Sequence, residues 1–250
     1  LAATILFRAP AWSQPRPVTD YEYDAQGNLT KILAPLSRTT EQTYDALNRL
    51  KTSKDPALGI TQYGYNSLDR MNSVTDPRNV ITTYSYNGLG DRLSQVSPDT
   101  GTTTYTYDAA GNLKTATDAA GRLTTYAYDA LNRITQIVYT QAGQTTRTHT
   151  FTWDAGTNQK GRLTFAGYEN GYMQWSYDQQ GRVIRKQQTT GEVSLVMEYG
   201  YDSFGRLNEI TYPSGKKLTY TYTNGQITSI AVDGTTIVSG VSYFPFGAPK

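Results

Sequence analysis

The sequence repeats itself at a nearly fixed spacing, and this period constrains the fold more than any other feature. A tyrosine or tryptophan, usually followed by Asp or Asn, recurs along the 250-residue chain. We call these aromatic residues the anchors; they are Tyr23, Tyr44, Tyr65, Tyr86, Tyr107, Tyr128, Trp153, Tyr177, Tyr201, Tyr222 and Tyr243. The first five steps are 21 residues each, the next three are 25, 24 and 24, and the last two are again 21. A catalytic motif is needed only once, so this recurrence predicts an array of one structural unit.

Each unit carries the pattern of a β-hairpin. Before an anchor, Tyr and Thr alternate, as in the Thr-Tyr-Thr-Tyr of residues 104–107, which is typical of a strand. Nine anchors have an aromatic residue two positions earlier, Gln42 and Val241 being the exceptions, and this spacing places both rings on one face. After the turn, a second strand begins with an apolar residue; these are Leu29, Leu50, Met71, Leu113, Ile134, Val183 and Leu207.

Two turns complete each unit. Four residues past the anchors lie residue types that tolerate the positive φ of a tight hairpin turn: Gly27, Gly111, Gly181, Gly205 and Gly247, with Asn48, Asp69 and Asn132 in the same place. The Asp that follows an anchor can accept hydrogen bonds from turn amides; these are Asp24, Asp45, Asp108, Asp129, Asp154, Asp178 and Asp202. The second turns are expected at residues 55–59, 76–79, 98–101, 118–121 and 213–215.

These patterns predict an all-β fold of tandem antiparallel hairpins with about twenty strands. Two strands of about six residues and two turns of about four residues together account for the length of one repeat. A sheet this wide must curl, and only barrels of about eight strands are filled by side chains. We therefore expect a wide curled or spiral sheet that forms part of a hollow shell. Longer strands or loops are expected around residues 140–160, where the period stretches. The array is assigned to residues 20–250, and residues 1–19 to an N-terminal extension.

The N-terminal extension has two interpretations. Residues 1–7 are apolar, and the small-x-small sequence at residues 11–13 resembles a cleavage site, so the segment could be the remnant of a signal peptide. Against this, Arg8 interrupts the apolar run and no basic start precedes it. The second interpretation is a strand or linker of a longer chain.

The anchor motif, Tyr-Asp-x-x-Gly-[Asn/Arg]-[Leu/Ile] followed by a turn of the Asp-Pro-x-Gly type, resembles the YD repeats of the RHS family over about residues 20–250. The resemblance implies hairpins that coil into a large hollow shell. In bacterial members this shell is similar to a cocoon around a C-terminal toxin; relatives include insecticidal toxin-complex subunits, wall-associated bacterial proteins and animal teneurins. Residues 243–247 look like the last motif before the family's core-associated region. That region, with its self-cleaving acidic residues, lies outside this sequence, so no catalytic residue is carried over.

Composition argues against several classes of protein. The net charge is only +2 with 18% charged residues and no basic stripe, so no nucleic-acid partner is expected. The hydrophobic content of 37% is low for a packed globular domain and is as expected for a sheet with one face exposed to solvent. The chain has no cysteine, which excludes disulfides and thiol catalysis. We expect no membrane-spanning helix.

Several residues could carry chemistry, but each has a structural explanation. His149, the only histidine, lies in an alternating stretch, and no Ser marks a catalytic triad. The turn aspartates could pair as glycosidase carboxylates or bind calcium, yet Asp is also a turn residue. The tyrosine rows could stack on sugars when exposed, or pack between units. Arginines just after the turns are expected to pair with acids or stack on tyrosine rings; they are Arg49, Arg70, Arg133, Arg162, Arg182 and Arg206.

The sequence thus predicts a non-catalytic structural shell segment of an RHS-type secreted or delivered protein, with no catalytic, cofactor-binding or metal residue and no cofactor. The shell would enclose a C-terminal polypeptide, a toxin, that lies outside this sequence. The alternative is a cell-surface adhesion module that binds carbohydrate or a partner cell. Expected partners are flanking repeats and the cargo polypeptide, with carbohydrate as a further option. The expected location is secreted or on the bacterial cell surface.

Overall fold

The computed structural model describes residues 17–244 and residue 247. Most of the expected N-terminal extension at residues 1–19, including the stretch compared with a signal peptide, lies outside the described residues, as does part of the motif at residues 243–247. The first strand begins at Asp20. Within the described residues, no helix is long and apolar enough to cross a membrane.

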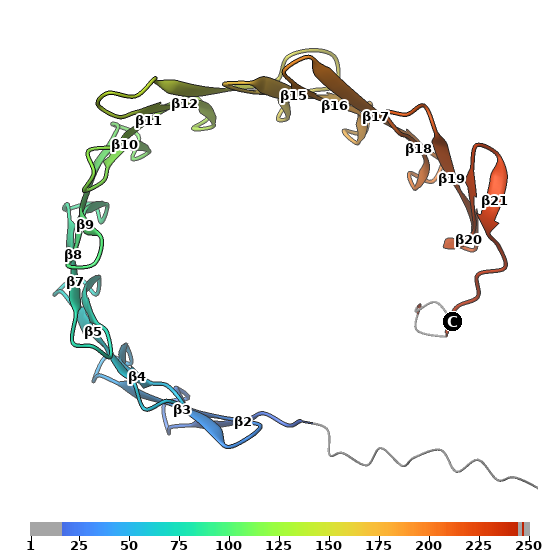
Figure 1. The fold of residues 1–250 in the computed structure, drawn as a ribbon. Coiled ribbons are helices and arrows are strands. Elements are labelled where there is room, and N and C mark those ends of the chain that lie inside the picture. The colour runs from blue at the N-terminus through green and yellow to red at the C-terminus, as the bar shows by residue number, and fades with distance from the viewer. Residues whose placement is uncertain (1–16, 245–246, 248–250) are drawn as a thin grey trace, which may run out of the picture. The chain divides into compact units, whose positions relative to one another are not determined.

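The described part of the chain is all-β, with 21 strands that belong to one antiparallel sheet. This confirms the predicted fold class of tandem antiparallel hairpins. The chain divides into two compact units, residues 1–104 and residues 105–250, and the division falls within β9 (Gly101–Tyr107). In each unit, strands that follow one another in sequence pair side by side (Figure 1).

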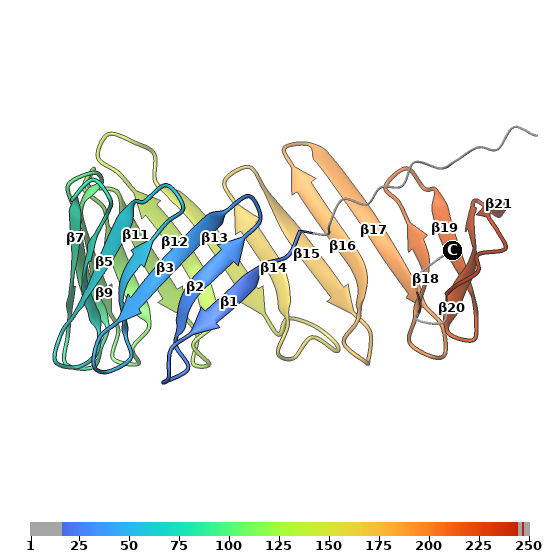
Figure 2. The same ribbon diagram turned by 90° about the horizontal axis from the view of Figure 1, so that it is seen from below.

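The strands of the first unit are short. They are β1 (Asp20–Tyr23), β2 (Leu29–Ala34), β3 (Arg38–Tyr44), β4 (Leu50–Lys54), β5 (Ile60–Tyr65), β6 (Met71–Thr75), β7 (Ile81–Tyr86), β8 (Arg92–Ser97) and the first part of β9. The turns after β1, β3, β5 and β7 gather at one end of these strands, and the other turns gather at the opposite end (Figure 2). The anchors end the odd-numbered strands.

The second unit contains the longest strands. They are β10 (Leu113–Thr117), β11 (Leu123–Tyr128), β12 (Ile134–Thr140), β13 (Arg147–Trp153), β14 (Leu163–Tyr168), β15 (Gly171–Tyr177), β16 (Val183–Thr190), β17 (Val193–Tyr201), β18 (Leu207–Thr211), β19 (Lys217–Thr223), β20 (Gln226–Val232) and β21 (Thr235–Val238). The stretching of the period is visible as a six-residue connection at 141–146, a nine-residue turn at 154–162, and the nine-residue strand β17. The expectation of longer strands or loops is confirmed.

Neither unit has a core of its own. Among the described residues no apolar side chain is buried, and the only buried residues are the polar Ser97 and Thr164. Contacts between strands are made by sequence neighbours, so no second layer covers either face of a unit (Figure 1). Each strand is therefore stabilised by its two neighbours and by half-buried side chains, as in an array of repeats.

Most turns after an anchor share one geometry, and several turns at the other end of the strands share it too. After the anchor Tyr23, the amide of Gly27 donates to the carbonyl of Asp24 at 3.1 Å, and the amide of Asp24 donates to the carbonyl of Asn28 at 2.9 Å. This is a type I turn followed by a left-handed residue. The expected positive φ is confirmed at every such place that the sequence singled out: Gly27, Asn48, Asp69, Gly111, Asn132, Gly181, Gly205 and Gly247.

The strand register shifts by one residue at the anchors. Thr43 lies opposite Thr52, but the next residue, Tyr44, lies opposite Leu50, so Lys51 is an extra residue in β4. The same β-bulge occurs at the anchors of β1, β5, β7, β11, β13, β15, β17 and β19. A bulge increases the local twist and changes the direction of the side chains that follow it.

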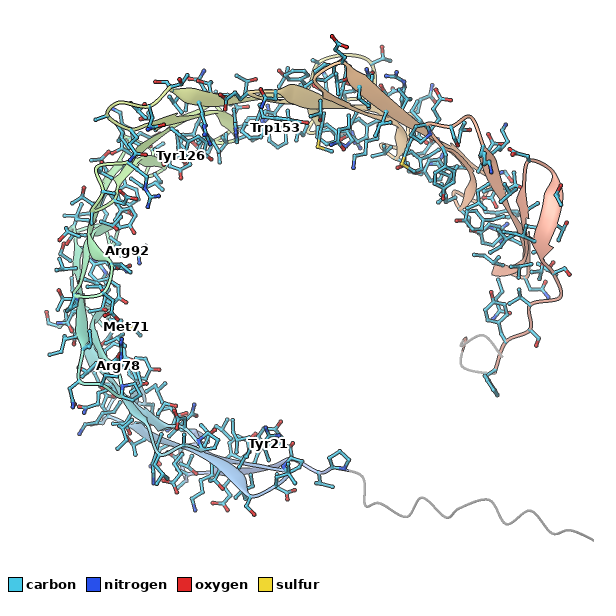
Figure 3. All side chains as sticks on the ribbon, viewed as in Figure 1. Tyr21, Met71, Arg78, Arg92, Tyr126 and Trp153 are labelled. Carbon is cyan, nitrogen blue, oxygen red and sulfur yellow. The ribbon has the colours of Figure 1, made fainter. Side chains whose placement is uncertain are left out.

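The two faces of the sheet differ in each unit. We call the face that carries the anchor side chains the anchor face, and the other the opposite face. In the second unit, Tyr126 and Trp153 lie on the anchor face (Figure 3). The opposite face carries pairs of small hydroxyl side chains that hydrogen-bond across strands, such as Thr43 with Thr52 and Ser85 with Ser94, both at 2.6 Å.

Candidate functional site: the contacts between neighbouring hairpins

The polar tip of an anchor reaches the hairpin that precedes it. The Tyr44 hydroxyl donates to the carbonyl oxygen of Leu29 at 2.9 Å, and the Trp153 Nε1–H donates to the carbonyl oxygen of Ile134 at 2.8 Å. In both cases the acceptor is the first residue of an even-numbered strand. The same rule holds for the pairs Tyr65–Leu50, Tyr86–Met71, Tyr128–Leu113, Tyr177–Leu163, Tyr201–Val183 and Tyr222–Leu207. The anchor side chains therefore join successive hairpins at the end of the strands where they turn.

Partial burial favours the neutral form of four of these phenols. Burial raises the pKa of Tyr177 and of Tyr128 above the ordinary value of about 10. At Tyr65 and Tyr201, burial also raises the pKa, although a nearby arginine opposes it. A neutral phenol is the form that can donate the hydrogen bond to the carbonyl.

The aspartate after an anchor holds its own turn together. One carboxylate oxygen of Asp45 accepts from the amides of Leu47 at 2.9 Å and Arg49 at 3.0 Å. Because the Arg49 side chain and these amides stabilise the charged form, the pKa of Asp45 lies below its usual value. At Asp202, burial opposes this effect, but the amide and guanidinium of Arg206 still lower the pKa of the carboxyl.

The arginine after the turn connects two hairpins. The Arg49 guanidinium pairs with Asp45 of its own turn at 2.7 Å and with Asp69 of the next turn at 2.5 Å. It also lies over the ring of the next anchor, Tyr65, with its Cζ 4.5 Å from the ring centre. Arg133, Arg182 and Arg206 repeat the ion pair in their own turn and the stacking on the next anchor. The expectation that these arginines pair with acids or stack on rings is confirmed, and in these four both contacts occur together and link the carboxylate, the cation and the ring. Arg70 and Arg162 lie over the rings of Tyr86 and Tyr177.

In two hairpins an asparagine occupies the position that Arg49 has after its anchor. The Asn28 amide donates to Asp24 of its own turn and to the Asn48 side chain of the next turn, both at 2.9 Å. In the second unit the Asn112 amide donates in the same way to Asp108 and to Asn132. Sequence reasoning missed this contact. The available signal is that an Asn in the fifth place after an anchor coincides with an Asn at the left-handed position of the following turn.

Some turn glycines are needed for a second reason. A Cβ on Gly90, whose φ is 102°, would lie 2.8 Å from the Arg70 guanidinium. A Cβ on Gly181 would collide with the guanidinium of Arg162, which lies against that turn. At Gly111, in contrast, a Cβ would meet no atom within 4 Å, so only the positive φ of 84° restricts that position.

The candidate catalytic residues are not brought together. The His149 ring packs edge-on against Tyr139, with centroids 5.2 Å apart, on the anchor face of β13. The turn aspartates are occupied by the amides of their own turns, which supports their structural explanation. Within the part of the chain that the structure describes, no three His, Cys, Asp or Glu side chains gather where they could hold a metal ion.

Two family models match the chain. The RHS-repeat model matches residues 23–60, 44–81, 86–123 and 107–144, and each of these four matches begins at an anchor. The teneurin YD-shell model matches residues 136–243. The repeated hairpins are therefore those of a YD shell, and the chain belongs to the RHS-repeat and YD-shell family.

Solved structures share this fold. The crystal structure of TcdB2-TccC3-Cdc42 matches with a TM-score of 0.70 at 16% identity, over 93% of this chain and 15% of that one. The crystal structure of TcdB2-TccC3 without its hypervariable C-terminal region gives 0.69 at 15% identity, with the same coverage of 93% and 15%. A Tc holotoxin pore of Photorhabdus luminescens gives 0.67 at 16% identity, over 93% of this chain and 15% of that one. The chain thus spans about 15% of the length of these relatives. No curated protein matches it by sequence.

Proposed function

We propose that this chain is a wall segment of a hollow shell in a secreted or delivered RHS-type protein, and that the shell encloses a polypeptide C-terminal to the repeats. The observation that carries the proposal is the absence of a buried apolar side chain among the described residues. A single-layer sheet with two accessible faces makes a partition between two spaces. The curl that closes such a partition follows from the twist of wide sheets.

The anchors have a structural role in this proposal. The eleven anchors hold each hairpin to its neighbour, and the turn aspartates with Gly111, Gly181 and Gly205 shape the turns; none of them acts on a substrate, and no cofactor or metal takes part. Their recurrence in every hairpin fits a mechanical function, because each hairpin must be held to its neighbours with similar strength.

Flanking repeats are the first expected partners. Strand β1 is exposed along its length, and its aromatic residues Tyr21 and Tyr23 are 54% and 61% exposed. An open strand edge recruits another strand. In this proposal residues 20–250 form the wall, and residues 1–19 are an N-terminal extension or the remnant of a signal peptide.

The structural function is favoured over adhesion through the tyrosine rows. Adhesion to carbohydrate requires rings that are free to stack on a ligand. The anchor hydroxyls instead donate to backbone carbonyls, and several anchor rings are covered by an arginine of the preceding turn. The fold shared with toxin-complex structures supports delivery outside the cell as the setting for the wall.

The test is protection of the enclosed polypeptide. The chain is produced together with the polypeptide that follows it in its gene and is exposed to a protease at low concentration. We expect the downstream polypeptide to survive while the array is intact. Replacement of Trp153 and Tyr201 by Ala should open the wall and speed cleavage, whereas replacement of the exposed Gln62 should not. Equal cleavage in all variants would refute enclosure.

A further inference from the structure

Three asparagines of this chain are each followed by glycine, and the structure places them in three different environments. They are Asn87, Asn170 and Asn224. Asparagine before glycine can lose ammonia without an enzyme, because the backbone nitrogen of the glycine attacks the side-chain carbonyl carbon and the glycine has no side chain to hinder the approach. The dipeptide is the same at all three sites, so differences in reactivity must come from the surrounding structure.

The side chain of Asn87 is held at both ends of its amide. Its Oδ1 accepts from the backbone amides of Leu89 at 2.9 Å, Gly90 at 2.8 Å and Asp91 at 2.9 Å. Its Nδ2 donates to the Asp91 carboxylate at 2.7 Å. The side chain must rotate before its Cγ can meet the backbone nitrogen of Gly88, and this rotation breaks all four hydrogen bonds. Asn87 is therefore protected by its own turn.

Asn170 is exposed, but the backbone around it is held. Its carbonyl oxygen accepts from the amide of Gly191 at 2.9 Å. The residue that follows it, Gly171, begins β15 and is paired with Tyr168 on one side and with Thr190 on the other. A residue paired on both sides in an antiparallel sheet donates its amide to one of the two neighbouring strands. The Gly171 amide is thus part of the sheet and is not free to attack.

Asn224 lacks both restraints. With Gly225 it forms the two-residue turn between β19 and β20, and their φ values of 51° and 81° are those of a type I′ turn. Both residues are exposed. Within the part of the chain that the structure describes, neither the Asn224 side chain nor the Gly225 amide makes a hydrogen bond. A Cβ on Gly225 would meet no atom within 4 Å, so the space around the turn is open.

We propose that Asn224 is a site of spontaneous deamidation. The Gly225 backbone nitrogen loses its proton to hydroxide and bonds to Cγ of Asn224, and the Cγ–Nδ2 bond breaks as ammonia leaves. Water then opens the cyclic imide at either of its two C–N bonds, which yields aspartate or isoaspartate. The backbone must rotate at Asn224 before the attack, and such a local opening costs little free energy at an exposed hairpin tip.

The product changes the hairpin that carries it. Isoaspartate adds one carbon atom to the backbone of the turn, and the register of a hairpin depends on the length of its turn. Strand β20 carries the carbonyl oxygen of Ile227, which accepts from the hydroxyl of the anchor Tyr243 at 2.8 Å. Deamidation should therefore weaken this contact between hairpins. The site is a slow, irreversible timer for the hairpin β19–β20, and it does not depend on the proposed shell function.

The experiment ages the complete folded chain at mildly alkaline pH and follows each asparagine by peptide mass spectrometry. Electron-transfer fragmentation distinguishes isoaspartate from aspartate. We expect Asn224 to react about tenfold faster than Asn87, because the hydrogen bonds that hold Asn87 must break first. Asn170 should also react more slowly than Asn224. The control is the same chain unfolded in guanidinium chloride, in which all three asparagines should react at similar rates.

Two variants test the assigned causes. Asp91→Ala removes the acceptor of the Asn87 Nδ2 and should speed the deamidation of Asn87. Asn224→Gly removes the reacting amide and keeps a residue suited to a type I′ turn. Ageing should therefore lower the unfolding temperature of the unsubstituted chain and leave that of Asn224→Gly unchanged.

The comparison of rates within one molecule decides the proposal even if a variant fails to fold. Faster reaction of Asn224 in the folded chain, together with similar rates in the unfolded chain, supports the site. An Asn224 that stays intact during ageing would overturn it, as would an Asn87 or Asn170 that reacts equally fast. The same order of rates in guanidinium chloride would also overturn it, because the structure would then not be the cause.

Discussion

The hairpins of residues 44–86 and those of residues 128–201 differ in length but keep the same contact. The former are spaced by 21 residues, the latter by 25, 24 and 24. The additional residues lie in three different places: the connection 141–146, the turn 154–162, and the long strands β16 and β17. In both regions the tip of the anchor still donates to the first carbonyl of the preceding even-numbered strand.

The comparison shows that the hydrogen bond between the anchor and the carbonyl is kept while the spacing between anchors varies. The donor and the acceptor are 15 residues apart for Tyr65, 19 for Trp153 and 18 for Tyr201, yet their hydrogen-bond distances are 2.9, 2.8 and 2.9 Å. Each of these anchors also lies opposite a β-bulge in the strand that follows its turn. Length variation is tolerated wherever it does not move this bulge.

The largest expected effect is the loss of an anchor. Trp153→Ala in the long region and Tyr65→Ala in the regular region should each lower the free energy of unfolding by about 2 to 3 kcal/mol, less than for a fully buried ring. Urea denaturation followed by circular dichroism measures both. If Trp153→Ala costs far less than Tyr65→Ala, the contact is not equivalent in the two regions.

The second prediction separates two kinds of turn glycine. Gly111→Val should cost about 1 kcal/mol because of its positive φ, and Gly181→Val about 2 kcal/mol because the Arg162 guanidinium must also move. Thermal unfolding of the two variants provides the comparison. Gly111→Asn is the control and should be nearly neutral, since Asn132 occupies the equivalent place with a φ of 59°. Equal losses at both glycines would mean that Arg162 does not restrict its turn.

Removal of the hydroxyl alone is a smaller change. Tyr65→Phe and Tyr201→Phe should each cost about 1 kcal/mol, the usual value of one hydrogen bond to a half-buried carbonyl. The ring and its stacking arginine remain, so the two losses should agree despite the different sequence separations. Chemical denaturation measures them. A neutral Tyr201→Phe would show that burial of the ring, and not the hydrogen bond, holds the long hairpins.

The loss of stability caused by a loop insertion should depend on where the insertion lies. Four glycines inserted between Gly143 and Gln144 lengthen a connection far from the bulge, and should cost about 0.6 kcal/mol or less. The matched insertion between Ala130 and Leu131 breaks the hydrogen bonds of the Asp129 turn and should cost clearly more. Thermal unfolding of both proteins gives the difference. Similar losses would contradict the view that the Asp129 turn is more sensitive to a change of length than the connection 141–146.

The pH dependence should be the mildest effect. Arg133 and the turn amides lower the pKa of Asp129 below its usual value, and Arg49 does the same for Asp45. A carboxyl with a lowered folded-state pKa stabilises the fold above its ordinary value of 3.8 and loses that contribution as the pH falls through the folded-state pKa.

Asp129→Asn and Asp45→Asn should therefore flatten the stability profile below about pH 4 without abolishing folding. Asn66 and Asn87 already occupy the same turn position in other hairpins, and each accepts the turn amides there. The measurement is thermal unfolding between pH 3 and pH 7. An unchanged acid profile in both variants would show that these ion pairs contribute nothing to stability.

Much of the fold could be predicted because it is encoded locally. The alternation of Tyr and Thr gives the strands, and the residues with positive φ, such as Gly27 and Asn48, give the turns. The arginine contacts could also be anticipated from the recurrence of Arg after each turn. The acceptors of the anchor hydroxyls could not be predicted, because every residue has a backbone carbonyl and the sequence does not indicate which one accepts the hydrogen bond.

By itself, the sequence determined the repeat, the strands and the hairpin order of this protein, since each depends on residues close together in the chain. The tertiary structure decided which side chains share a face. Leu163 and Phe165 are two residues apart, and simple alternation would put them on one face. The bulge at Thr164 places Leu163 opposite the anchor Trp153 but Phe165 opposite Thr152, on the other face. One extra residue reverses the alternation of every side chain after it, and its position depends on pairing with a neighbouring strand.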